Sequence, residues 1–276
     1  MTTVVQERVA LAIASAIAVV AIAAAAAGVP GSDDDAPLTV ATTAPATVPS
    51  VSTSPPATVS AQPQTSAAAP APATAAPAAA EGPGGTVPSK PGAYRYREVS
   101  DGETTEETVR ITDRGGGRQT EAETDFSSEV AWRSDGKYIL ESTFGQPPQG
   151  FRCDWNPDVL EYKLPLAQGT SWRAAQSCTA AQGFTIEFDS ASRVTGAERV
   201  RVAGQDVDTW VIRSEGTLTF RTPQGSSTQN LTSDNHFSPE HGLSVKSTET
   251  VEGPDPSTGD DVNETSTREI LNLTPD

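Results

Sequence analysis

The aromatic residues of this chain are confined to its later part, and this distribution limits where a folded core can form. No Phe, Trp or Tyr precedes Tyr94, and all of them lie between Tyr94 and Phe237. A hydrophobic core needs large apolar side chains, because their burial supplies much of the free energy of folding. The sequence therefore predicts one folded domain, over residues 91–276.

An uncharged run of mostly Ala, Val and Ile covers residues 9–29, directly after Arg8. A helix of this length is roughly 32 Å long at about 1.5 Å per residue, which is enough to cross a bilayer. We expect a transmembrane anchor, with residues 1–8 as a short cytoplasmic tail and the remainder outside the cytoplasm. A cleaved signal sequence is the alternative, because the run ends in small residues that suit a signal peptidase; the domain would then be secreted.

Residues 30–90 form a linker of low complexity. Pro, Ala, Thr, Ser and Val dominate it, and eleven Pro lie between Pro37 and Pro88. Pro lacks a backbone donor and the small side chains have little surface to bury, so we expect a disordered spacer between membrane and domain. Thr and Ser among Pro also leave O-glycosylation open.

The pattern changes to a period of two within residues 91–276. Phe184, Ile186 and Phe188 alternate with polar residues, and so do Leu218 and Phe220. Such alternation predicts strands with one wet face, and short Gly- and Asp-containing breaks between the runs predict hairpin turns. The fold class expected is all-β, an antiparallel meander of about ten strands that forms a curled sheet, a half-barrel or a sandwich.

Two cysteines, Cys153 and Cys178, lie in the part of the chain that is expected to be exported. Outside the cytosol a lone pair of cysteines most often forms a disulfide, and the sequence has no C-x-x-C redox motif. The sequence therefore predicts a structural disulfide between them.

Three motifs in the domain resemble a known group of proteins. They are Gly169–Trp172, Val202–Val211 and Phe237–Lys246, which read G-x-x-W, V-x-G-x-x-x-x-T-x-x-V and F-x-P-x-x-G-L-x-V-K. Their order resembles uncharacterised bacterial envelope β-domain proteins, which are similar in turn to the lipoprotein-carrier (LolA-like) half-barrels. The resemblance covers about residues 160–250 and implies a curved antiparallel sheet with an apolar concave face.

Few residues of this chain suggest catalytic chemistry. His236 and His241 flank a short turn with Glu240, but zinc needs three or four ligands, so a polar turn is expected. The acidic run 255–264 lacks the order of a calcium loop and is expected to be a solvated hairpin tip. No nucleophile or metalloprotease motif is present. The prediction is no catalytic residue, no metal ligand, no cofactor and no enzyme activity.

The four tryptophans are Trp132, Trp155, Trp172 and Trp210. Exposed on a sheet they could stack on sugars or bind a protein, whereas in a chain this poor in large apolar residues they are expected to form the core. The formal charge of −17 argues against nucleic acid as a partner.

The function expected is that of a non-catalytic, membrane-tethered extracytoplasmic β domain. Besides the membrane, its partner would be an apolar ligand such as a lipid. A structural or protein-interaction module of the cell envelope is the alternative, and a carboxylate-dependent hydrolase is the least favoured class. An open apolar cavity inside the sheet would favour ligand binding, and a filled interior would favour the structural module.

Overall fold

A computed structural model describes the chain from residue 82 onward. The predicted tail, the predicted helix and most of the predicted linker lie outside the described residues. No helix in the described part is long and apolar enough to cross a membrane. The described ranges are 82–145, 150–180, 183–223, 225–256 and 258–276.

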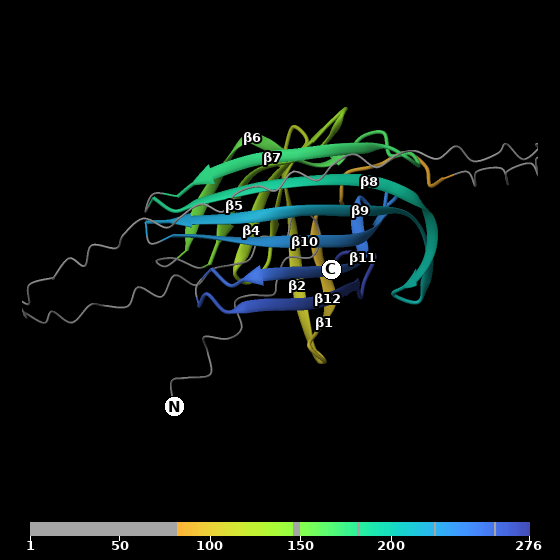
Figure 1. The fold of residues 1–276 in the computed structure, drawn as a ribbon. Helices are drawn as coiled ribbons and strands as arrows, with labels where there is room; N and C mark the ends of the chain where they lie inside the picture. Colours follow the sequence, from red (N-terminus) through yellow and green to blue (C-terminus); the bar gives the residue numbers. More distant parts are fainter. Residues whose placement is uncertain (1–81, 146–149, 181–182, 224, 257) are drawn as a thin grey trace, which may run out of the picture. The chain divides into compact units, whose positions relative to one another are not determined.

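Within these ranges twelve antiparallel strands form a closed barrel (Figure 1). Each strand pairs with the next along the chain, and β1 also pairs with β12, where Tyr96 lies opposite Ile270. The strands are β1 (Gly92–Ser100), β2 (Glu103–Gly115), β3 (Arg118–Ala122), β4 (Phe126–Arg133), β5 (Gly136–Phe144), β6 (Phe151–Lys163), β7 (Ser171–Thr179), β8 (Thr185–Val202), β9 (Gln205–Thr222), β10 (Gly225–Ser238), β11 (Leu243–Pro254) and β12 (Asp261–Ile270).

The predicted all-β antiparallel meander is confirmed, but two of its details are wrong. The described strands number twelve where about ten were expected, and the curled sheet closes into a barrel, so the half-barrel and sandwich forms of the prediction are wrong. Closure depends on pairing between the first and last strands, which removes the open edge that each of them would otherwise present. Local alternation carries no signal for such a distant pairing.

The interior of the barrel contains three clusters of buried hydrophobic residues. The first cluster includes Phe188, Leu218 and Phe220, from strands that alternate as predicted. The second includes Val200 and Val202, near the tip of the long β8–β9 hairpin that curves in Figure 1. The core therefore combines inward faces of the barrel with the end of this hairpin.

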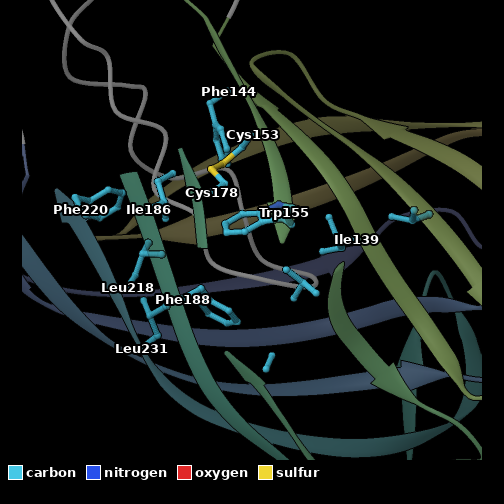
Figure 2. Packing of buried hydrophobic residues seen from close by; sticks show 13 residues of the cluster. Ile139, Phe144, Cys153, Trp155, Cys178, Ile186, Phe188, Leu218, Phe220 and Leu231 are labelled. Carbon is cyan, nitrogen blue, oxygen red and sulfur yellow. A yellow bond between two sulfur atoms is a disulfide. The ribbon is translucent and has the colours of Figure 1, made fainter. Parts of the chain in front are cut away.

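The predicted disulfide between Cys153 and Cys178 is present and lies in the first cluster. It joins β6 to β7, with the two Cα atoms 5.5 Å apart. Figure 2 shows it among Phe144, Trp155 and Ile186. Between β6 and β7 the paired positions in the described structure are reduced to Asn156 and Ser177, so the disulfide fastens the barrel where its ladder is shortest.

The two ends of the barrel differ. Residues 82–91 run along one end, which we call the closed end. There Ser89 Oγ donates to the carbonyl of Gly242 in the β10–β11 turn, and Gln119 Nε2 of β3 donates to the carbonyl of Ser89. Gly242 and Gln119 are far apart in the sheet, because four strands lie between them: β11, β12, β1 and β2. Residues 82–91 therefore bridge across the closed end.

Candidate functional site

The structure distributes the four tryptophans over separate parts of the core. Trp155, Trp172 and Trp210 are 4%, 9% and 7% exposed, and Trp132 is half-buried. Trp155 belongs to the first cluster and the other three belong to the third. The tryptophans therefore pack inside the barrel and do not gather on one surface.

The two histidines occupy different settings. His236 lies on β10, its Nδ1 is 3.8 Å from Glu198 Oε2, and burial lowers the pKa of the imidazole. His241 lies in the turn between β10 and β11. The acidic run after β11 forms a hairpin turn, in which the Thr258 N–H donates to Asp255 Oδ1.

A group of charged residues that the sequence analysis did not single out points into the barrel. We call it the interior charged cluster, and it holds seven carboxyl groups and two cations. In every case the side chain shares the inward face with core residues of its own or the neighbouring strand. Its members are Glu98, Glu107, Glu121, Glu123, Glu161, Glu249, Glu264, Lys137 and Arg268.

Lys137 is buried and is held between two of these carboxylates. Its Nζ lies 2.8 Å from Glu121 Oε1 and 3.0 Å from Glu161 Oε2. Burial alone would lower the pKa of Lys137, but Glu121 and Glu161 raise it above its ordinary value. Burial raises the pKa of Glu161 to about 8, and the charge of Lys137 opposes the rise. Because the ammonium contacts both acids directly, we treat this group as ionised.

Arg268 is the second buried cation. Its Nη2 donates to Glu123 Oε1 at 2.5 Å, and its guanidinium lies 4.4 Å from the centre of the Tyr96 ring. Burial alone would lower the pKa of Arg268, and Glu123 raises it. Glu98 stands directly opposite Arg268 on the neighbouring strand. Arg268 therefore lies between carboxyl groups and makes its direct ion pair with Glu123.

Two carboxyl groups of the interior that make no ion pair with a described residue also have pKa values close to neutral. Burial raises the pKa of Glu98 to about 7, although Arg268 opposes the rise. Burial and the charge of Glu98 raise the pKa of Glu249 to about 8. These groups therefore change their protonation near neutral pH.

Small polar residues form a row around part of the interior, which we call the serine row. Its members pair successively across six neighbouring strands, from β8 to β12 and on to β1. Glu249 of this row lies deep enough for burial to raise its pKa, yet part of its surface stays accessible to water. Space for a water molecule therefore remains beside Glu249. The row is Ser192, Ser214, Ser233, Glu249, Ser266 and Ser100.

The end of the barrel opposite the closed end carries a row of phenylalanines, and we call it the aromatic end. Phe126, Phe151 and Phe184 pack against the first cluster but are only partly buried. The row runs through neighbouring ring centroids 4.8 to 6.0 Å apart, in the order Phe126, Phe144, Phe151, Phe184 and Phe220. Val251, also partly buried against this cluster, lies two residues from Glu249 on the same face of β11.

Comparisons with known proteins assign no family. No family model matches the chain, and no curated protein matches it. Among solved structures, the hypothetical lipoprotein YmcC from Escherichia coli (K12) is 13% identical, with a TM-score of 0.37; the match covers 68% of this chain and 91% of that one. No functional conclusion follows from a likeness of this level, and the resemblance to lipoprotein carriers stays a prediction.

A surface cavity of about 350 Å³ lies near the closed end. Two arginines line it, and both are already in ion pairs: Arg118 with Glu129 at 2.5 Å, and Arg133 with Asp158 at 2.6 Å. These pairs reduce the positive charge that an anionic ligand would meet. The lining residues are Gly116, Arg118, Ala131, Trp132, Arg133, Leu140 and Asp158.

The stability of the domain is expected to fall as the pH rises through neutrality. The pKa values of Glu98 and Glu249 in the folded state, about 7 and about 8, lie above their ordinary value of 4.5. Between those values the folded state binds more protons than the unfolded state, so the free energy of unfolding decreases with rising pH. Each shift alone corresponds to more than about 2 kcal/mol between roughly pH 5 and pH 9, so we expect a loss of at least that size, measured by urea unfolding.

The matched control for this prediction is the double variant E98Q/E249Q, whose side chains cannot ionise. Its stability should vary less across the same pH range than that of the wild type. A wild-type protein that is equally stable at both ends of the range would contradict the prediction.

Proposed function

We propose that this barrel is a non-catalytic binding domain that takes an amphiphilic small molecule into its interior from the aromatic end. One observation carries the proposal. Partly exposed apolar residues at that end, Phe126, Phe151 and Phe184, continue through Val251 to the water-accessible Glu249. A ligand with a hydrocarbon tail and a polar end would match this succession of surfaces.

The sequence predicted an apolar ligand such as a lipid, and we now propose a ligand that also has a polar end. A purely apolar lipid would fit the first cluster, but the neighbouring face of β11, β12 and β1 is lined by Ser and Glu. Burying hydrocarbon against carboxyl groups leaves those groups without hydrogen bonds, which is unfavourable. A polar end on the ligand removes this conflict.

The location proposed for the domain is outside the cytoplasm, next to the cell membrane. The disulfide between Cys153 and Cys178 supports it, because structural disulfides persist mainly in oxidising compartments. The transmembrane anchor and the spacer remain predictions from the sequence, with the cleaved signal as the alternative.

The three buried clusters that occupy the interior favour the interaction-module alternative, but the surface of the barrel does not. An exposed aromatic patch would favour it, but the large hydrophobic side chains that are exposed in the described part of the chain are Val87 and Val99. For the hydrolase alternative, Glu121, Glu161 and Glu123 are engaged in ion pairs with Lys137 and Arg268, so we assign the interior carboxylates to structure and binding.

The proposal is tested with octanol as a neutral amphiphile. The full-length chain, exchanged from detergent into lipid nanodiscs, is titrated by calorimetry, with empty nanodiscs as the blank. We expect saturable binding that weakens roughly tenfold in the double variant F151S/F184S, since both rings would contact the ligand tail. The control V99S changes an exposed residue of β1 and should leave binding intact. Absence of saturable octanol binding to the wild type would overturn the proposal.

A further inference from the structure

The interior contains buried polar atoms that lack hydrogen-bond partners, and most of those near Arg268 are acceptors. The acceptors without a hydrogen-bond partner are Glu98 Oε2, Glu107 Oε2 and Glu123 Oε2. Beside these three acceptors, one donor, Arg268 Nε, is also unpaired. Glu98 is only 3% exposed. An unpaired buried polar atom carries a desolvation penalty that a ligand with the complementary group would relieve.

The charges in the interior also favour a ligand group that carries a positive charge. Both cations already contact carboxylates, Lys137 through Glu121 and Glu161, and Arg268 through Glu123. The remaining members of the interior charged cluster are all acidic: Glu98, Glu107, Glu249 and Glu264. The interior therefore holds more carboxyl groups than its own cations can neutralise.

Glu98 and Glu249 are placed to act on one ligand group. They come from β1 and β11, on either side of β12, and both face its Arg268: Glu98 directly and Glu249 on the diagonal. The charge of Glu98 raises the pKa of Glu249, as expected for neighbouring carboxyl groups. Two residues beyond Glu249, Val251 begins the apolar surface that leads to the aromatic end.

We infer that the ligand of the barrel carries a primary ammonium group, which binds between Glu98 and Glu249 while its hydrocarbon tail lies along Val251 toward the phenylalanines. This inference rests on the proposed function and names the chemistry of the polar end. An ammonium group has three donors and a positive charge, which match unpaired acceptors and surplus acid. A carboxylate end would meet like charges.

A metal ion fits this position less well. In the described ranges, no group of three or more His, Cys, Asp and Glu side chains is arranged to hold one. The ammonium, in contrast, needs hydrogen-bond acceptors on two sides and no fixed coordination number.

Binding of the ammonium is coupled to protons. Glu98 and Glu249 must ionise to pair with it, so octylamine should bind more tightly as the pH rises from about 6 to about 9, and each binding event should release protons. The charged groups that face this position are Glu107 of β2, Glu121 of β3 and the adjacent Glu123, Lys137 of β5, Glu161 of β6, and Arg268 and Glu264 of β12. Glu98 and Glu249 are the acids that would contact the ammonium, so their ionisation governs the dependence, and Glu107, whose pKa burial also raises, adds to it.

The test compares octylamine, octanol and octanoate, which share one tail, in the same calorimetric titration of the full-length chain at about pH 8.5. We expect octylamine to bind roughly tenfold more tightly than octanol, and octanoate to bind more weakly than both. In the double variant E98Q/E249Q the preference for octylamine over octanol should disappear. The matched control is E252Q, an exposed residue of β11.

The outcomes separate the inference from the proposed function. If octanol binds but octylamine binds no more tightly, or if octanoate binds best at Arg268, the inference is wrong and the binding domain stands. If none of the three binds, both are wrong. If the double variant does not fold, the wild type decides alone. Titration of octylamine at about pH 7, in two buffers of different ionisation enthalpy, must show proton release, and its absence overturns the inference.

Discussion

Replacing Arg268 by Met (R268M) is expected to lower the free energy of unfolding by about 3–5 kcal/mol. Met keeps much of the volume of the side chain but removes the cation that pairs with Glu123 and faces Glu98. Carboxyl groups that stay buried without that cation are strongly destabilising, and the unpaired acceptors near it would increase in number. Urea unfolding followed by tryptophan fluorescence at about pH 8 measures the loss.

Two further variants identify the cause of that loss. In R268M/E123Q the main partner of the removed cation is neutral, so the double variant should recover a large part of the lost stability. The control R97M changes an exposed arginine on the outer face of β1 and should alter stability by less than about 0.5 kcal/mol. An R268M protein as stable as the wild type would show that the interior tolerates its acids without this cation.

Loss of the disulfide in C153A/C178A is expected to lower the free energy of unfolding by about 3 kcal/mol. The bond closes a loop with a sequence separation of 25 residues, and it fastens β6 to β7, whose described ladder is reduced to Asn156 and Ser177. Cross-linking restricts the unfolded chain, and the short ladder offers little to replace it in the folded one. Urea unfolding of the variant against the wild type measures the effect.

The position of this loss within the barrel is also predicted. Hydrogen exchange in C153A/C178A should increase in β6 and β7 more than in β9 and β10, whose ladder extends over thirteen paired positions. Reduction of the wild type by dithiothreitol should reproduce the stability of the variant. Uniform exchange along all strands would instead mean that the disulfide acts on the barrel as a whole.

The sequence alone supported the strand-built domain for local reasons. Phe184, Ile186 and Phe188 alternate with polar residues, and each of them lies on the inner side of the sheet with the first cluster. The disulfide could also be predicted from the sequence, since two cysteines in a domain that is expected to be exported can form only one pair. The strands are predicted from residues that are neighbours in the sequence, and the disulfide is predicted from the identity of two residues.

The interior charged cluster could not be inferred in the same way. In β1 the inward residues are Tyr94, Tyr96 and Glu98, and a glutamate in an alternating strand is normally assigned to the wet face. Glu249 occurs between Ser247 and Val251 and looks like a surface residue for the same reason. One signal was available: continuing the period of two from Tyr96 and from Ile270 places Glu98 and Arg268 inward.

The sequence by itself determined that residues 91–276 form antiparallel strands with one apolar face and that two cysteines can cross-link them, because side-chain periodicity and residue type are local properties. Only the tertiary structure decided that β1 meets β12, that the sheet closes, and that acids from β1, β2, β3, β6, β11 and β12 share one interior with Lys137 and Arg268. Those outcomes depend on which distant strands pair and in what register, and register sets which side chains share a face.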